Sequence, residues 1–145
     1  KYFQRCLFYG MFPSMFSHNA SEDPYWRSPD LYNRDRGLFL RYIPLIKKIA
    51  EAGWEPVTYA ITDNESVYVE RFGPDKSGDI FFTLMNDSSK NQKVVVSFIN
   101  IEKVQKVRDH ISGKEIEIST HSGQLRLELE MLPEQVCLLS LDSKP

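Results

Sequence analysis

The chain has 145 residues, the length of one ordinary domain, and its 18 basic and 20 acidic side chains leave a formal net charge of −2. This balance offers no basic surface for a polyphosphate, so we expect no nucleic-acid partner. No apolar run approaches the roughly 20 residues that span a bilayer, so we expect no membrane partner. Cys6 and Cys137 are too few for a dense disulfide framework or a four-ligand zinc site. We interpret both as small buried hydrophobes and expect no metal and no cofactor.

The N-terminal part of the sequence predicts one apolar element and then a long loop. Residues 2–9 mix aromatic and apolar side chains and stop at Gly10, which is consistent with a short buried strand or with the end of a helix. Residues 10–29 contain three prolines and no sustained periodicity. A loop of more than about 12 to 15 residues usually carries function or is disordered, and the aromatic content argues against disorder. The candidates for a ligand-facing wall are Phe12, Phe16, His18, Tyr25 and Trp26, although each ring could equally fill the bottom of a core.

A long amphipathic helix is predicted next. Ser28-Pro29-Asp30 is typical of a helix start, with Asn33 or Asp35 as a possible second start. From Leu38 to Ala52 apolar residues recur every three or four positions, so one stripe is expected to be buried. Pro44 predicts a kink or two abutting helices, and Gly53 predicts the end.

After Trp54 the apolar period changes from helical to alternating. Both faces of residues 78–86 are apolar, which predicts a central strand covered on one face by a second sheet and on the other by something else. The polar residues 87–92 then predict a hairpin to residues 93–99, a further strand is expected at 115–118, and Ser122-Gly123 predicts a turn. Seven or eight short strands at this spacing predict an antiparallel β-sandwich over residues 54–145.

Residues 1–53 are too few to form a domain of their own and need another body to pack on. The chain begins with an apolar element and not with a methionine, so we interpret it as a fragment of a longer protein.

Several stretches together resemble the end of glycoside hydrolases in which a (β/α)8 barrel is followed by a C-terminal all-β domain. They are residues 79–86, the turn Asp109-His-Ile-Ser-Gly-Lys-Glu115 and the closing strand 132–141. Residues 1–53 are similar to the last strand, long loop and last helix of such a barrel. The fold class implied is mainly β: an antiparallel β-sandwich preceded by a strand-loop-helix segment that looks like the last βα unit of the barrel. The resemblance covers nearly the whole chain and identifies no single family.

This resemblance implies hydrolysis of a glycosidic bond by two carboxylates. The implied partners are a carbohydrate substrate and the remainder of a catalytic barrel. If residues 2–9 are the eighth strand, the loop lies at the catalytic mouth, and the substrate-binding residues would be Phe12, His18, Tyr25 and Trp26. The catalytic pair would come from earlier strands, so neither Glu22 nor Asp23 is assigned as catalytic. A secreted or periplasmic protein is the favoured expectation.

Two other classes of function stay open. The chain could be a non-catalytic sandwich that binds carbohydrate or protein, or a purely structural β-domain that braces a neighbour. A binding sandwich would need exposed aromatic side chains on its strands. Core packing explains these rings more simply, so we expect all of them in the core: Tyr59, Tyr68, Phe72, Phe81, Phe82 and Phe98.

Overall fold

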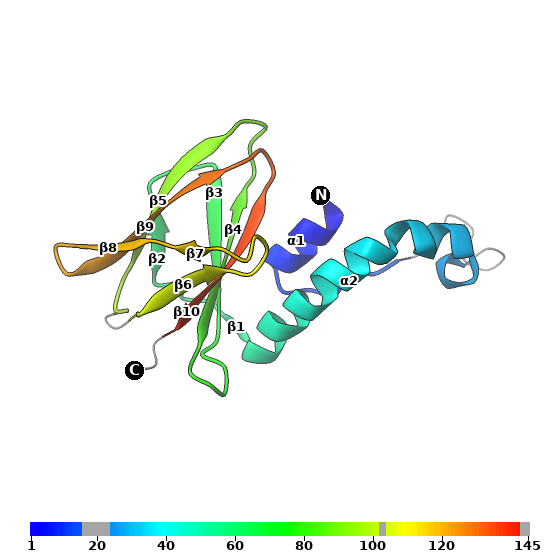
Figure 1. The fold of residues 1–145 in the computed structure, drawn as a ribbon, viewed down its shortest axis with the longest axis horizontal. Helices are drawn as coiled ribbons and strands as arrows, with labels where there is room; N and C mark the ends of the chain where they lie inside the picture. The colour runs from blue at the N-terminus through cyan, green and yellow to red at the C-terminus, as the bar shows by residue number, and fades with distance from the viewer. Residues whose placement is uncertain (16–23, 102–103, 143–145) are drawn as a thin grey trace.

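The computed structural model describes residues 1–15, 24–101 and 104–142, which form a two-sheet β-sandwich with helices packed on one face (Figure 1). All strand pairs are antiparallel. The predicted fold class, a mainly β antiparallel sandwich, is confirmed, whereas the segment before it is helical where a strand-loop-helix segment was expected.

The larger sheet has six strands in the order β1-β3-β4-β10-β6-β7. These strands are β1 (Trp54–Glu55), β3 (Val67–Phe72), β4 (Ile80–Asn86), β6 (Lys106–Asp109), β7 (Glu115–Ile116) and β10 (Val136–Asp142). The smaller sheet has four strands in the order β2-β5-β9-β8. They are β2 (Ala60–Thr62), β5 (Gln92–Phe98), β8 (Ile118–His121) and β9 (Gln124–Met131).

Strand β4 is covered on both faces, as its sequence predicts. Phe82 and Leu84 point into the core between the two sheets, whereas Phe81 and Met85 belong to a second buried cluster beneath the helices. Between the latter two, the buried Thr83 hydroxyl donates a 2.7 Å hydrogen bond to the carbonyl oxygen of Phe8. The second cover of the strand is therefore helical, and it is fastened by a polar bond as well as by apolar contacts.

The predicted hairpin between β4 and β5 is wrong. β4 pairs with β3 and β10, while β5 pairs with β2 and β9 in the other sheet. The chain crosses between the sheets after Asn86, whose buried amide nitrogen donates to the carbonyl oxygens of Lys90 at 2.8 Å and Leu132 at 2.9 Å. These bonds stabilise the crossing between the sheets. β4 and β5 both bury apolar side chains in the core between the two sheets, and they do so without pairing with each other.

The strand expected at 115–118 also divides between the sheets, with β7 ending before Glu117 and β8 beginning after it. By contrast, the predicted turn at Ser122-Gly123 is confirmed. It joins β8 to β9, with φ of 51° at Ser122 and 79° at Gly123. Two positive φ values in a two-residue loop are the pattern of a type I′ hairpin turn.

Of the two alternatives for residues 2–9, the helix is confirmed: this segment is α1 (Tyr2–Phe8). The eighth barrel strand that the resemblance implied at these residues is therefore wrong. Phe3, Cys6 and Leu7 are buried, and their spacing of three and four residues places them on one side of a helix. A short apolar run cannot be assigned to strand or helix from periodicity alone. Burial against α2 and β10 therefore decides the conformation here.

Helix α1 ends in a close approach to the sheet. The amide of Met11 donates to the carbonyl oxygen of Cys6 and that of Gly10 donates to Leu7, the pair of bonds that defines a Schellman motif. Gly10 has φ of 64°, and a Cβ atom at this position would lie 2.6 Å from the ring of Phe72 on β3. Glycine is required here by both conformation and contact.

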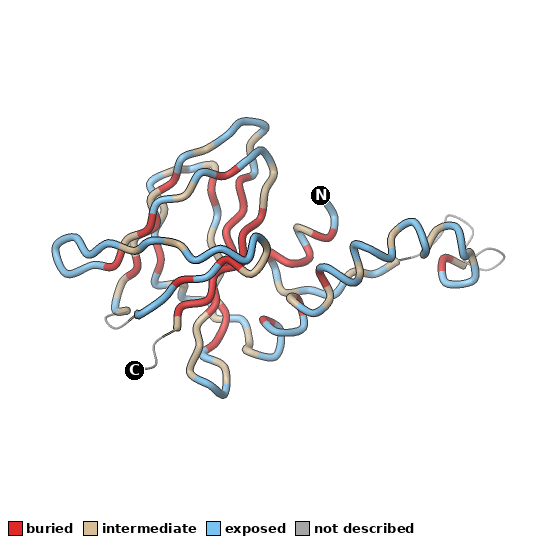
Figure 2. Tube along the Cα trace, viewed as in Figure 1, coloured by how far each residue is buried: buried red, intermediate tan, exposed pale blue. Residues whose placement is uncertain are grey.

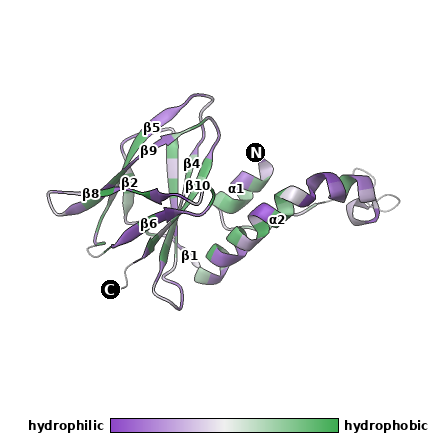
Figure 3. Ribbon diagram, in the orientation of Figure 1, coloured by the Kyte–Doolittle hydropathy of each residue, from purple (hydrophilic) through white to green (hydrophobic). Residues whose placement is uncertain are grey.

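Helix α2 (Pro29–Ala52) is longer than its apolar stripe alone predicts. It begins after the N-cap Ser28, as expected, and not at Asn33 or Asp35, and it runs through Pro44 as a single helix to Gly53. Figures 1 and 2 show its C-terminal half next to the sandwich and α1, whereas its N-terminal half, residues 29–41, extends away from the sandwich. We call residues 29–41 the outer half of α2. Hydrophobic residues continue along it among charged ones (Figure 3).

The helices and the larger sheet share one buried cluster, which includes Leu7, Ile46 and Leu138. Because this cluster joins residues on both sides of the boundary between residues 53 and 54, the structure does not separate a barrel segment from the sandwich there. The division of the chain into these two parts stays a prediction. Within the described part of the chain, neither α1 nor α2 combines the length and apolar character that crossing a membrane requires.

Candidate functional site

The predicted site residues fall at the outer end of α2 and in the loop after α1. Phe12 is exposed in that loop. Tyr25 and Trp26 lie together in a short 3-10 helix, η1 (Tyr25–Arg27), directly before α2. His18 lies outside the described residues, as do Phe16, Glu22 and Asp23. The structure thus brings two of the four predicted residues together.

An aromatic cluster positions η1. The ring of Phe39 on α2 lies 5.0 Å from that of Phe3 and 5.4 Å from that of Trp26, measured between centroids. Tyr25 and Trp26 meet edge to face at 4.9 Å. Tyr25 is only 5% exposed, whereas Trp26 is 60% exposed. Tyr25 therefore resembles a core residue, and Trp26 presents most of its ring to solvent.

A carboxylate network lies beneath this cluster. The Tyr25 hydroxyl donates to Oδ2 of Asp35 at 2.9 Å, and Arg34 binds both oxygens of the same carboxylate at 2.9 Å through Nε and Nη2. The hydrogen bonds from Arg34 and then Tyr25 lower the pKa of Asp35 below its ordinary value. Burial, and then the bond to Asp35, raise the pKa of Tyr25. At neutral pH Asp35 is a fixed anionic acceptor and Tyr25 a neutral donor.

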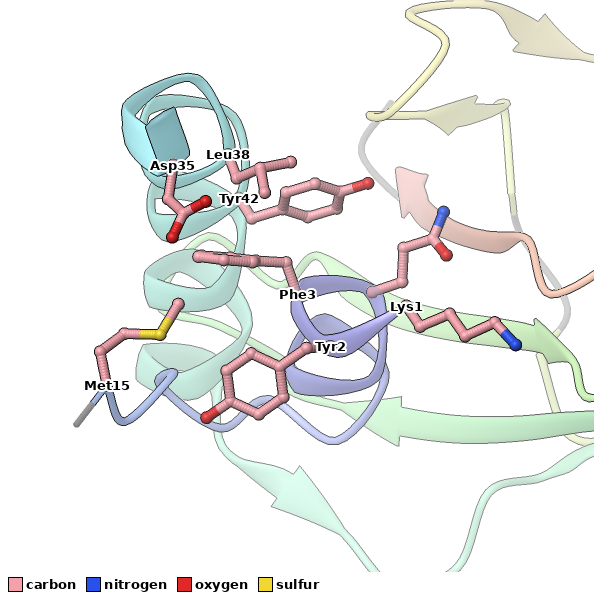
Figure 4. A pocket seen from close by; sticks show the side chains of 8 residues that line it. Lys1, Tyr2, Phe3, Met15, Asp35, Leu38 and Tyr42 are labelled. Carbon is pink, nitrogen blue, oxygen red and sulfur yellow. The ribbon is translucent and has the colours of Figure 1, made fainter. Parts of the chain in front are cut away.

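Asp35 also opens onto a hollow between α1 and α2 (Figure 4). The hollow has a volume of about 430 Å³ and is lined by Lys1, Tyr2, Phe3, Gln4, Met15, Asp35, Leu38 and Tyr42. Its size falls within the range of small-molecule sites, which is about 300 to 1,000 Å³. Its walls combine aromatic rings with the carboxylate of Asp35, which accepts hydrogen bonds, the ammonium group of Lys1, which donates them, and the amide of Gln4, which can do both. This chemistry suits a ligand with several hydroxyl groups.

The hollow lacks the groups for glycosidic hydrolysis on its own. That reaction uses two carboxyl groups, about 5 to 9.5 Å apart, one of which must hold a proton in an acid step. Among the described lining residues Asp35 supplies the only carboxylate, and its lowered pKa opposes the role of acid. No cluster of three or more His, Cys, Asp or Glu side chains that could hold a metal ion occurs in residues 1–15, 24–101 and 104–142.

Neither cysteine offers a nucleophile to this site. Both Cys6 and Cys137 are buried free thiols, which confirms their interpretation as small core residues. Burial raises the pKa of Cys6 above its ordinary value and that of Cys137 to about 12. Thiolate, the reactive form, is therefore scarce at neutral pH.

Sequence reasoning missed Asp35 as a site residue. The sequence indicated Asp35 only as a possible helix cap. The nine residues between Tyr25 and Asp35 include a helix start, and the position of that start decides whether the two side chains meet. No local pattern marks the pair, although an acid in the first turns of an aromatic-rich helix is a weak signal.

Part of the expectation for the sandwich aromatics is also wrong. Phe72, Phe81, Phe82 and Phe98 are buried as expected, but Tyr59 and Tyr68 are exposed, as is Trp54. Tyr68 lies on the side of β3 that faces α1, where it lines a hollow together with Phe8 and Tyr9. The edge strand β1 pairs only with Arg71 and Phe72 of β3 and does not extend to Tyr68. Alternation along the strand predicts the face but not whether another element covers it.

The chain was compared with known proteins at the level of sequence and of structure. No protein-family model matches it, and no curated protein matches it. A GH27 β-L-arabinopyranosidase from Geobacillus stearothermophilus shares the fold over 97% of this chain and 28% of its own, with 18% identity and a TM-score of 0.50. An α-amylase from Anoxybacillus does so over 77% of this chain and 24% of its own, with 15% identity and a TM-score of 0.51.

A variant of AmyP in complex with maltotriose is similar over 76% of this chain and 22% of its own, with 17% identity and a TM-score of 0.51. The chain therefore spans about a quarter of the length of these proteins. At such identities the likeness is one of fold. The expected resemblance to a part of glycoside hydrolases is confirmed at that level, and no particular family is singled out.

Proposed function

We propose that residues 1–145 are the C-terminal part of a glycoside hydrolase. In this proposal the sandwich braces a catalytic (β/α)8 barrel, the outer half of α2 packs against that barrel, and the loop 10–29 lines the sugar site. The partners are a carbohydrate substrate and the remainder of the barrel. The observation that carries the proposal is the uncovered apolar surface on the outer half of α2.

This surface needs a second body. Leu40 is 71% exposed, and Leu38 and the neighbouring Trp26 are exposed with it. An amphipathic helix gains its stability by burying its apolar face. The C-terminal half of α2 is covered, which buries Ile46 and Ile49. In the outer half, Phe39 is partly buried against the same cluster, whereas Leu38 and Leu40 stay exposed. The likeness to the arabinopyranosidase runs through 97% of this chain. This supports a helical segment and a sandwich that belong together inside a larger glycosidase.

The chemistry of the outer end agrees with a sugar site. The axial C–H groups of a pyranose form an apolar surface that packs on an aromatic face, and Trp26 and Phe12 both present exposed rings. Asp35 offers an ionised acceptor for hydroxyl groups nearby. The two catalytic carboxylates would come from the barrel, so residues 1–145 contribute binding and support.

Comparing the activity of the complete protein with that of residues 1–145 tests this proposal. The complete coding sequence would be expressed alongside residues 1–145, and both would be assayed with a panel of 4-nitrophenyl α- and β-glycosides. We expect hydrolysis of at least one glycoside by the complete protein and none by residues 1–145. Activity of residues 1–145 alone, or a complete protein that cleaves no glycoside of the panel, contradicts the proposal.

Amide hydrogen exchange tests the packing of α2 separately from catalysis. In the complete protein we expect slower exchange over residues 29–41 than in residues 1–145, because a barrel would cover this part of the helix. The matched control is β4, which is already buried on both faces and should exchange at the same rate in both samples. Equal exchange over residues 29–41 would show that no such cover exists.

A further inference from the structure

A second hollow lies where the C-terminal end of α1 meets β3. Its volume is about 330 Å³. Buried Phe8 and Met85 contribute an apolar base. Two exposed rings line it as well: Tyr9, which is 47% exposed, and Tyr68, which is 50% exposed. The aromatic side chains thus come from two elements that are far apart in sequence and meet only in the fold.

Charged side chains also line this hollow. Glu70 lines it from β3, and its Oε2 atom accepts a 2.7 Å hydrogen bond from Nε1 of Trp54, which holds the carboxylate in place. Asp87 and Arg5 line it from the other elements and form an exposed ion pair, with Nη2 and Oδ1 2.9 Å apart. The described lining residues therefore carry two anions and one cation.

We propose that this hollow is a saccharide-binding site that takes a neutral pyranose unit of a glycan chain. Tyrosine faces suit the C–H surface of such a ring, while carboxylates accept hydrogen bonds from its hydroxyl groups and a guanidinium donates to its oxygens. The excess of negative charge disfavours phosphate, sulfate or uronate ligands. The volume lies at the lower end of the range for small-molecule sites, which fits one ring or two.

This inference stands apart from the proposed function. None of its residues belongs to the loop 10–29 or to the outer half of α2, and it requires no catalytic activity. It gives a role to Tyr68 and Trp54, whose exposure core packing does not explain. Binding can be measured on residues 1–145 without a barrel, so its failure and a failure of the glycosidase proposal are distinguishable.

Affinity electrophoresis on residues 1–145 tests the site. Native gels would contain amylopectin, arabinogalactan, galactomannan or xylan, and the protein's migration would be compared with that in a gel without polysaccharide. We expect at least one of the four to retard the protein. Tyr68→Ala and Tyr9→Ala should each weaken the affinity about tenfold, because each removes one aromatic contact. Tyr68→Phe, which keeps the ring, should bind nearly as well as the wild type.

Tyr59→Ala is the matched control, since Tyr59 is an exposed ring of the same sandwich that does not line the hollow. Thermal melts of every variant establish that each is folded. If Tyr68→Ala does not fold, Asp87→Asn serves in its place, because it removes the charge and keeps the shape. The proposal is overturned if no polysaccharide retards the wild type, if retardation persists in Tyr68→Ala and Tyr9→Ala, or if Tyr59→Ala loses it equally.

Discussion

The sandwich and the outer half of α2 bury their apolar residues to very different extents. Between the sheets, Phe82, Leu84 and Val96 are completely buried, and each is enclosed by residues of the same chain. Along the outer half of α2, Leu38 is 43% exposed, although it lies on the same side of the helix as the buried Tyr42, Ile46 and Ile49. Leu40, on the opposite side, is 71% exposed. One helix is thus part of the core at one end and largely exposed at the other, a difference that the proposed packing against a barrel would explain.

The largest expected effect is on the sandwich side of this comparison. Phe82→Ala should lower the free energy of unfolding by about 3 to 5 kcal/mol, because lost burial and the remaining cavity add, and Phe82 is fully buried with its ring 4.9 Å from that of Phe98. Urea denaturation measures the change. The same substitution at exposed Phe12 should cost no more than about 0.5 kcal/mol. A cost below about 1 kcal/mol for Phe82→Ala would move β4 from the centre of the fold to its surface.

A second pair of substitutions compares the two halves of α2 directly. Ile46→Ala should destabilise the chain by about 2 to 4 kcal/mol, since Ile46 is fully buried against α1 and the larger sheet. Leu40→Ala in residues 1–145 should change stability by no more than about 0.5 kcal/mol. Chemical denaturation of both variants gives the difference. Equal costs would mean that Leu40 is covered within residues 1–145, which would remove the basis for an external partner.

His110 provides a smaller, pH-dependent test of the boundary between α2 and the sandwich. Its ring centroid lies 6.3 Å from that of Phe81, and Nζ of Lys48 on α2 lies 5.0 Å from the same Phe81 ring. Nε2 of His110 is buried without a hydrogen-bond partner in the described part of the chain. Burial, then Lys48 and Arg108, lower the pKa of His110 below 6.5, against opposing contributions from Asp109 and Asp142.

The sign of the effect follows from this lowered pKa. As the pH falls through about 6.5 the unfolded chain takes up the proton before the folded chain does, so stability decreases. It stops decreasing once the pH has passed the lowered pKa of the folded state. Urea midpoints measured between pH 7.5 and pH 5 should show this decline, and His110→Asn should flatten it. A variant with the same pH dependence as the wild type would assign the decline to other groups.

Trp26→Ala is expected to have a small effect on stability and a larger one on activity. Trp26 is 60% exposed, so we expect a loss of less than about 1 kcal/mol in residues 1–145. In the complete protein the same substitution should weaken glycoside hydrolysis while the melting temperature stays nearly unchanged. Tyr25→Phe, which removes the hydroxyl bonded to Asp35, is a useful companion because it keeps the ring in the cluster. A variant of Trp26 that loses stability but keeps normal turnover per folded molecule would exclude this end from the sugar site.

Local patterns in the sequence were sufficient for a large part of the fold. Ser122-Gly123 predicted the turn between β8 and β9, and the two apolar faces of β4 predicted its central place. Ser28-Pro29 and Gly53 predicted both ends of α2. These features depend on neighbours within a few residues, because backbone geometry decides which side chains share a face and caps satisfy the free groups at a helix end.

Tertiary structure alone decided which strands pair, what covers each face and which distant side chains meet. β5 pairs with β9 and not with β4, α1 is a helix because α2 and β10 cover its apolar side, and Tyr68 is exposed because nothing in the described chain covers that part of β3. The contacts of Tyr25 with Asp35, and of Tyr9 with the hollow beside Tyr68, belong to the same class. The physical reason is that a periodic pattern states which residues seek burial, whereas the choice of partner depends on contacts between segments far apart in the chain.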